Sequence, residues 1–291
     1  MINVALVQHQ SLTTVEANLA ALMEKIAQSA KNGAKLVVLQ ELHNSHYFCQ
    51  TEDIAYFNLG ETIPGPSTEK LSSLCKELNI VLVASLFENR GREVYHNTAV
   101  VFDTDGSIAG IYRKMHIPDD PGYYEKFYFT PGDLGFKPIK TSIATLGVLI
   151  CWDQWFPEAA RLQALAGAEL LIYPTAIGWA PEDPEEEKQR QLQAWQLIQR
   201  SHAISNGIPV LSCNRVGFEA DPTAATAGID FWGHSFVCGP QGETLVQAKT
   251  AEEILHCQLD LSHSCKIKQL WPFLRDRRID NYQELSKRII D

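Results

Sequence analysis

Short runs of apolar residues recur along the whole chain and are separated by more polar segments. Their length and their content of valine, isoleucine and leucine favour β-strands, and several lack polar alternation, which predicts burial on both faces. The predicted strands have the sequences INVALVQ, AKLVVLQE, NIVLVASLFE, NTAVVFD, SIAGIYR, ATLGVLIC, AELLIYPT, IPVLSCN, HSFVCGP and EILHCQLD.

Apolar residues at helical spacing appear between some of these strands. Thr13 and Glu16 have the spacing of a capping box at the start of the first helix, and Gly33 supplies its end. The predicted buried face of this helix consists of Leu19, Leu22, Ile26 and Ala30. Further helices are predicted over residues 67–79, 155–167 and 186–206.

The resulting order of elements is β-α-β-α-β-β-β-β-α-β-α-β-β-β, followed by a polar tail. This mixture predicts an α/β protein in which helices pack over large sheets, rather than a purely doubly wound fold. The sequence has no internal repeat and no linker-like stretch. We therefore expect one domain over residues 1–291.

Composition narrows the classes of partner. The chain has 291 residues, 45% of them hydrophobic, and 35 acidic against 25 basic residues, which gives a formal net charge of −10. This charge argues against a nucleic-acid groove and against an anionic membrane surface, and it suits either a cationic ligand or a merely solvated surface. The start, MINVALVQHQ, is typical of a strand and lacks the features of a signal peptide. We therefore expect a cytoplasmic protein.

The seven cysteines are scattered, odd in number and free of C-x-x-C pairs. This pattern argues against a disulfide framework and against a structural zinc site. Most of them are expected to be small buried hydrophobic residues, with room for one reactive thiol.

Cys151 is the candidate for that thiol, because it ends the strand ATLGVLIC and the helix WFPEAARLQALAG begins a few residues later. At such a turn the helix dipole favours a thiolate, and neighbouring backbone N–H groups can hold an oxyanion. An inert buried thiol is the alternative. A nucleophilic thiol also needs a base, and none of the nine histidines can be matched to Cys151 by spacing.

Two charged residues occupy similar positions at strand ends. Glu41 ends the apolar run AKLVVLQE, and Lys114 follows SIAGIYR. Ligands commonly bind at the carboxyl ends of strands in open α/β sheets. Each residue alone has a plain alternative, a solvated carboxylate or a surface lysine, but a glutamate can relay a proton and a lysine can stabilise an oxyanion.

The segments around these three residues resemble the motifs of a known family. VVLQEL, YRKMHIP and GVLICWDQWFPEAAR resemble the three motifs of the nitrilase superfamily of carbon–nitrogen hydrolases, and their order and spacing fit the chain from Met1 to about Asp280. PGYYEKFYFTPGD, YPTAIG and FLRDRR further resemble the branch that hydrolyses the ureido group of a carbamoylated diamine. The resemblance implies a four-layer α-β-β-α sandwich.

The resemblance also implies roles. Cys151 would be the nucleophile, Glu41 the general base, and Lys114 the oxyanion stabiliser together with the N–H of Trp152. Glu125 matches the second glutamate that the superfamily places beside the lysine, and an ion pair with a neighbouring lysine is a compatible alternative. Thiol hydrolysis of this kind requires no cofactor and no metal.

The implied substrate is a small cationic ureido compound, converted to a diamine, carbon dioxide and ammonia during polyamine biosynthesis. A distal ammonium calls for carboxylates or aromatic faces in the pocket. The candidates for substrate contact are Tyr47, Trp152, Thr175, Trp179 and Glu182, with Asp183 beside them. A carbamoyl amino acid or an ω-amide is the alternative substrate, and its carboxylate would call for an arginine, for which Arg215 is the candidate.

Three further features of the sequence allow more than one interpretation. His43 and His46 have a spacing of three residues but no third ligand nearby, so the sequence does not predict a metal site. The acidic loop 182–187 could be a pocket wall or a solvated loop. The resemblance implies a homo-oligomer, a dimer or larger, and the tail 262–291, with Trp271, Phe273 and clustered arginines, suits either an arm on a neighbouring subunit or a cap on its own domain.

Overall fold

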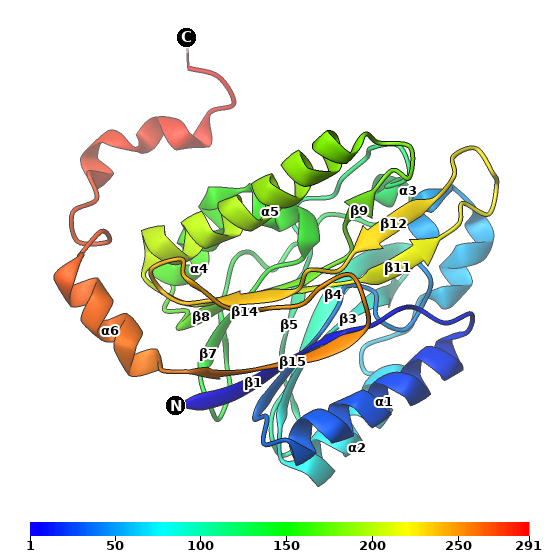
Figure 1. The fold of residues 1–291 in the computed structure, drawn as a ribbon, viewed down its shortest axis with the longest axis horizontal. Coiled ribbons are helices and arrows are strands. Elements are labelled where there is room, and N and C mark those ends of the chain that lie inside the picture. The colour runs from blue at the N-terminus through cyan, green and yellow to red at the C-terminus, as the bar shows by residue number, and fades with distance from the viewer. Residues whose placement is uncertain (291) are drawn as a thin grey trace.

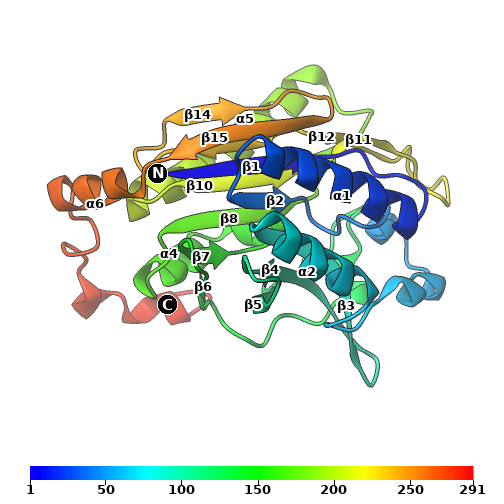
Figure 2. The ribbon, with the colours of Figure 1, turned by 90° about the horizontal axis from the view of Figure 1, so that it is seen from below.

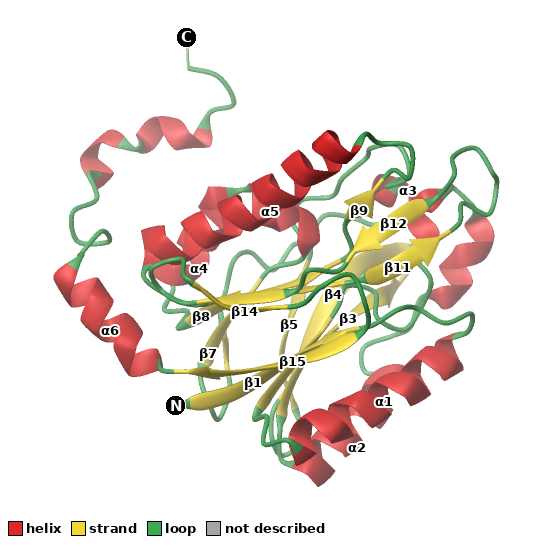
Figure 3. Ribbon diagram, viewed as in Figure 1, coloured by secondary structure: helices red, strands yellow, loops and turns green. Residues whose placement is uncertain are grey.

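Most of the strands lie in two six-stranded sheets in the computed structural model, which describes residues 1–290 (Figure 1 and Figure 3). In spatial order the first sheet contains β15 (Glu253–Leu259), β1 (Ile2–Gln8), β2 (Leu36–Leu39), β3 (Val81–Gly91), β4 (Val94–Phe102) and β5 (Ile108–Arg113). The second contains β14 (Thr244–Gln247), β13 (Phe236–Cys238), β10 (Val210–Asn214), β8 (Leu170–Thr175), β7 (Thr145–Val148) and β6 (Ile139–Lys140).

Six α-helices accompany the sheets in the described part of the chain. They are α1 (Val15–Lys31), α2 (Pro66–Leu78), α3 (Glu125–Tyr128), α4 (Pro157–Leu165), α5 (Glu185–Asn206) and α6 (Leu261–Leu270). The long helices α1 and α2 lie side by side along one flank (Figure 2).

Alternate residues of the first sheet face two different cores. In β1, Val4 and Leu6 belong to the core between the two sheets, whereas Ala5 and Val7 pack with Leu22 of α1 on the outer face. The central core also takes residues of β7, β8 and β10 and of the helices α4 and α5. Because both faces of the strands are covered, their sequences are continuously apolar. This arrangement confirms the predicted four-layer α-β-β-α sandwich.

The start of α1 differs from the prediction. Thr14 caps the helix, and its side chain accepts a hydrogen bond of 3.1 Å from the N–H of Ala17. Thr14, not Thr13, is the N-cap, and the helix begins at Val15, so Glu16 lies one position too early for a capping box with Thr14. The predicted capping box is therefore wrong by one residue.

The sequence patterns also missed a small third sheet. It consists of β11 (Val216–Glu219), β12 (Ile229–Trp232) and β9 (Gly178–Trp179), paired in an antiparallel manner. Its strands have two to four residues, too few to give a clear alternation of apolar and polar positions.

The C-terminal segment leaves the sandwich. After α6 the chain runs outward and away from the sheets through two short 3-10 turns (Figure 1). Several large apolar residues are exposed there, including Leu270, Trp271, Ile279, Leu285, Ile289 and Ile290. Residue 291, the last of the predicted arm 262–291, lies outside the described residues, and the role of this arm in assembly stays a prediction.

Among residues 1–290, no helix combines the length and the apolar character that a transmembrane span requires.

Candidate active site

Glu41, Lys114 and Cys151 each follow the end of a buried strand. Glu41 lies two residues beyond β2, Lys114 lies directly after β5, and Cys151 lies three residues beyond β7. The first two strands belong to one sheet and β7 to the other, so the site forms where the ends of the two facing sheets meet.

Lys114 joins two carboxylates in a fully buried cluster. Its Nζ lies 2.7 Å from Oε1 of Glu41 and 2.6 Å from Oε2 of Glu125. Burial alone would lower the pKa of Lys114, but the charges of Glu125 and Glu41 outweigh burial and hold that pKa well above its usual value. Lys114 is therefore a permanent cation in this site.

Glu125 comes from the short helix α3 and has a different environment from Glu41. Burial raises the pKa of Glu125 to about 7, against the opposing charge of Lys114 and with a further increase from Glu41. The Tyr47 hydroxyl donates a hydrogen bond of 2.7 Å to Oε1 of Glu125. Glu125 can therefore exchange a proton near neutral pH, and the hydrogen bond from Tyr47 fixes the position of its carboxyl group.

The two oxygens of the Glu41 carboxylate are unequal. Oε1 accepts from Lys114 and also from Nδ2 of Asn97 at 2.7 Å. Oε2 is buried and has no hydrogen-bond partner among residues 1–290. The sequence analysis did not identify Asn97, although an amide at the start of the apolar run NTAVVFD was an available signal. The unpartnered oxygen gives Glu41 a free site for a proton.

Cys151 occupies a strained turn. Its φ angle is 41°, in the left-handed region that residues other than glycine seldom adopt. It opens the 3-10 turn Cys151–Trp155, and its thiol lies 3.8 Å from the carbonyl oxygen of Ala176. No hydrogen bond occupies the N–H of Trp152 within residues 1–290. That N–H can therefore donate to a ligand beside the thiol.

The protonation of Cys151 differs from the expectation based on the helix dipole. Burial raises the pKa of the Cys151 thiol well above its ordinary value, the charge of Glu41 raises it further, and Lys114 opposes the rise. The nine-residue helix α4 starts only at Pro157, beyond the intervening 3-10 turn. The free site therefore holds a thiol that needs a base.

Asp153 connects the nucleophile turn to the lysine segment. Its Oδ2 accepts from the N–H of Ile150 at 2.9 Å and from the hydroxyl of Tyr112 at 2.8 Å. Its Oδ1 lies 3.0 Å from the backbone nitrogen and 2.7 Å from Nδ1 of His116. Because His116 is two residues from Lys114, this buried carboxylate fixes the two segments relative to each other.

A cavity of about 420 Å³ opens at Cys151. Its charged lining residues are all acidic, Asp120, Glu125 and Asp183, and no lysine or arginine lines it in the described part of the chain. Aromatic side chains supply much of the remaining wall, namely Tyr123, Trp152, Trp155 and Trp232. Such a lining suits a ligand with an apolar body and a cationic end.

The candidate substrate contacts fall into two groups. Trp152 lines the cavity, together with Cys151 and Glu125. The other four do not, namely Tyr47, Thr175, Trp179 and Glu182. Sequence reasoning did not select Asp120, and it named Asp183 only beside Glu182, because adjacent acidic residues in one loop look alike until the backbone fixes their directions.

The four residues that do not line the cavity either contact other parts of the protein or are exposed. Tyr47 lies behind Glu125, and the indole N–H of Trp179 donates to the carbonyl of Lys188 at 2.9 Å. Thr175 is buried, and its carbonyl accepts from the backbone N–H of Glu41 at 3.4 Å. Glu182 is exposed to solvent. These placements link Tyr47 and Thr175 to the charged residues rather than to the cavity.

Arg215 is buried away from the cavity at Cys151. Its guanidinium donates to the carbonyl oxygens of Glu41 and Leu42 at 3.1 and 2.9 Å and lies 2.6 Å from Oε1 of Glu219. A guanidinium so occupied supports the loop after β2 and is not available to a substrate carboxylate.

His43 and His46 have different surroundings. His43 is buried against the carbonyl of Ser85 at 2.8 Å, and burial lowers the pKa of His43 to about 4. His46 is half exposed and lies 3.3 Å from Glu219. Among residues 1–290 no three histidine, cysteine, aspartate or glutamate side chains are grouped so that they could hold a metal ion.

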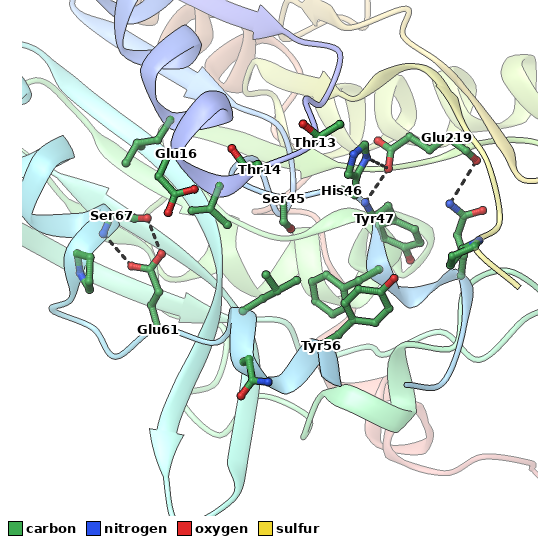
Figure 4. Close-up of a pocket in the computed structure, with 18 of the residues that line it drawn as sticks. Thr13, Thr14, Glu16, Ser45, His46, Tyr47, Tyr56, Glu61, Ser67 and Glu219 are labelled. Atoms are coloured by element: carbon green, nitrogen blue, oxygen red, sulfur yellow. Dashed lines mark hydrogen bonds and ion pairs between the residues drawn. The ribbon is translucent and has the colours of Figure 1, made fainter. Parts of the chain in front are cut away.

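A second, larger cavity of about 910 Å³ lies against the loop that carries Tyr47 (Figure 4). Its charged and polar walls include Glu16, His46, Glu61 and Glu219. The backbone N–H of Tyr47 donates to Glu219 at 2.7 Å on this side, while its hydroxyl reaches Glu125. Tyr47 therefore lines the larger cavity and, through its hydroxyl, contacts Glu125, which lines the smaller one.

Known proteins resemble this chain over its length. A family model described as carbon-nitrogen hydrolase matches residues 3–269. The chain is 41% identical over 288 residues to an N-carbamoylputrescine amidase of Solanum lycopersicum, covering 98% of this chain and 95% of that protein. It is 43% identical over 290 residues to a citrullinase of Francisella tularensis, covering 99% of each.

A solved structure gives a similar result. The crystal structure of a carbon-nitrogen hydrolase from Helicobacter pylori G27 superimposes with a TM-score of 0.97 at 53% identity, covering 99% of each chain. The two curated relatives carry the names of different activities, so similarity by itself does not select a substrate.

Proposed function

Since the chain belongs to the carbon–nitrogen hydrolase family, we propose that it is a thiol amidohydrolase that converts N-carbamoylputrescine and water to putrescine, carbon dioxide and ammonia. The observation that carries this choice is the lining of the cavity at Cys151. Carboxylates and aromatic faces surround it, and the described residues contribute no basic side chain. A cationic ureido substrate suits that lining, and a substrate carboxylate does not.

The first step uses the free oxygen of Glu41. Oε2 of Glu41 takes the proton of the Cys151 thiol as the sulfur attacks the ureido carbon. Because burial keeps the thiol protonated before this step, base and nucleophile act together rather than through a preformed thiolate. The product of the attack is a tetrahedral intermediate with a negative oxygen.

Lys114 and the N–H of Trp152 would stabilise that oxygen. Lys114 is a buried cation, and a preorganised donor of this kind is worth about 3 kcal/mol of activation free energy. The protonated Glu41 then returns its proton to one of the two ureido nitrogens, which leaves with the electrons of its bond to carbon. A thiol ester of carbamic acid remains on Cys151.

Water completes the cycle. Glu41 removes a proton from a water molecule that attacks the acyl carbon, and the same proton returns to the departing sulfur. The resulting carbamic acid decomposes to carbon dioxide and the second amine. Glu125 would anchor Lys114 throughout, because it binds the same ammonium from the opposite side.

A matched pair of substrates tests the choice. Citrulline is N-carbamoylputrescine with one carboxylate added on the carbon that bears the amine. We expect kcat/KM for N-carbamoylputrescine to exceed that for citrulline by about 100-fold, because no described residue of the cavity pairs with the added charge. Ammonia release measures both rates.

The same assay includes N-carbamoyl-β-alanine and a simple ω-amide acid. Cys151→Ala should lower ammonia release from each of these compounds by roughly 10⁴-fold or more. Equal or faster turnover of citrulline, the carbamoyl acid or the ω-amide by the unaltered enzyme would overturn the proposed substrate while leaving the hydrolase chemistry in place.

A further inference from the structure

Asn97 is a fully buried amide in the middle of β4. On one side of β4 lies β5, the strand before Lys114, and on the other lies β3, which pairs with β2, the strand that leads to Glu41. Its Nδ2 donates 2.7 Å to Oε1 of Glu41, and its backbone carbonyl accepts 2.9 Å from the N–H of Lys114. The same residue therefore contacts both members of the central ion pair, although it does not line the cavity.

A second contact fixes the direction of the amide. The Ser85 hydroxyl donates to Oδ1 of Asn97 at 3.1 Å, which turns Nδ2 toward Glu41. The same hydroxyl accepts the N–H of Leu42 at 3.2 Å, and Leu42 has a φ of 48°. Ser85 thus fixes the amide and also holds the strained backbone position that directly follows Glu41.

A carboxylate has two equivalent oxygens until its partners distinguish them. At Glu41 both donors, Lys114 and Asn97, bind Oε1, and Oε2 is left buried without a partner. An unsatisfied buried oxygen is costly and strongly favours acquiring a proton donor. Lys114 alone would leave the carboxylate free to rotate about that single contact, and Asn97 removes this freedom.

We propose that Asn97 is a positioning residue: by binding Oε1 of Glu41 it assigns Oε2 as the oxygen that receives the Cys151 proton. Ser85 sets the direction of the Asn97 amide. This inference rests on the proposed function. Other titratable groups act on Glu41 from every neighbouring element. They are Lys114, Glu125, Cys151, Tyr47, Cys49 and Tyr123. Among the described groups, Asn97 is the neutral donor on the carboxylate.

The test is the pH dependence of alkylation of Cys151 by iodoacetamide, which needs no substrate. Removing a donor from a carboxylate makes protonation easier, so in Asn97→Ala the rise of alkylation with pH should move up by about one pH unit. With N-carbamoylputrescine, kcat should fall about 10- to 100-fold while KM changes less than about threefold.

Two further variants test the same assignment independently of Asn97→Ala. Asn97→Asp retains the shape and the contact with Ser85 but replaces the donor by a second carboxylate, so it should shift the pH dependence further than Asn97→Ala. Ser85→Ala should give a smaller shift in the same direction. These variants also serve if Asn97→Ala fails to fold, which thermal unfolding reports.

Thr98→Val is the matched control. Thr98 lies beside Asn97 on β4, is equally buried, and donates 2.6 Å to Glu88, a carboxylate outside the site. It should leave the pH dependence of alkylation unchanged. An unshifted pH dependence in Asn97→Ala and Asn97→Asp, or an equal shift in Thr98→Val, would overturn the assignment. Failure of turnover with every ureido substrate, with the alkylation shift intact, would instead count against the proposed substrate alone.

Discussion

The two cavities that Tyr47 connects, as a lining residue of the larger one and as the hydrogen-bond partner of Glu125 in the smaller one, differ in a way that volume does not reveal. The larger, about 910 Å³, contains the buried carboxylate of Glu219, which already binds Arg215, the Tyr47 N–H and His46. The smaller, about 420 Å³, has behind it a carboxylate oxygen of Glu41 with no partner. A buried carboxylate oxygen without a partner, rather than space, distinguishes the smaller cavity as the region that can perform chemistry.

Glu219, in the larger cavity, and Glu125, in the smaller one, differ in the same way in their pKa values. Burial would raise both, but Arg215 and the other partners of Glu219 lower the pKa of Glu219 to about 2. Lys114 is shared between two carboxylates, so burial prevails at Glu125 and raises its pKa to about 7. One glutamate is a permanent anion that holds a loop, and the other can change its protonation near neutral pH.

The largest expected effect separates the cavities by activity. Cys151→Ala should lower ammonia release by roughly 10⁴-fold or more, because no other group replaces a nucleophile. Lys70→Ala, at the wall of the larger cavity, should leave kcat/KM unchanged. Steady-state assays of both variants measure the contrast, and a comparable loss in Lys70→Ala would show that the larger cavity participates in the reaction.

The next effect is on stability. Glu219→Gln leaves Arg215 buried without a charged partner and should lower the free energy of unfolding by about 3–5 kcal/mol. The Glu219 pKa is lowered in the fold from 4.5 to about 2, so its contribution is present above about pH 4.5 and is lost as the pH falls toward about 2.

Urea unfolding between about pH 3 and pH 7 measures this difference. The wild type and Glu219→Gln should converge as the pH falls. Glu16→Gln, an exposed carboxylate of the same cavity, is the control and should stay within about 0.5 kcal/mol of the wild type at all pH values. A constant difference between wild type and Glu219→Gln over this range would contradict the assignment.

Tyr47→Phe tests the hydrogen bond that connects the larger cavity to Glu125. Without its hydroxyl, which lowers the pKa of Glu125, that pKa should rise above about 7, and the pH profile of kcat/KM should move in the alkaline direction. Loss of a hydrogen bond to a charged group also predicts about a tenfold lower kcat/KM. Tyr56→Phe, at the wall of the larger cavity, should leave the profile in place; identical profiles for the two variants would argue against a role of Tyr47 at Glu125.

The smallest expected effect distinguishes two residues of one loop. Asp183 lines the cavity at Cys151, whereas the adjacent Glu182 is exposed outside it. Asp183→Asn should raise KM for N-carbamoylputrescine about 3- to 10-fold with little change in kcat, since a partly exposed ion pair is worth about 1 kcal/mol. Glu182→Gln should not change KM. An equal rise in both variants would indicate a general charge effect of the loop.

Much of the fold could be predicted because its strands are buried on both faces and therefore appear as unbroken apolar runs. The apolar runs predicted helices packed over large sheets, and the resemblance carried by the segments around Glu41, Lys114 and Cys151 implied the family and the four-layer sandwich. The three-stranded sheet could not be predicted, because its short strands are defined by pairing with distant segments. The cap at Thr14 depended on a backbone angle that the sequence does not specify.

The sequence by itself determined which reactive groups stand at the ends of strands. Only the tertiary structure decided their states, because the groups that act on them are distant in the chain. Asn97 and Lys114 are 56 and 73 residues from Glu41, and together they leave one of its oxygens unpartnered. Burial, which no local pattern measures, raises the pKa of the Cys151 thiol despite the helix that follows, and so makes that oxygen necessary as a base.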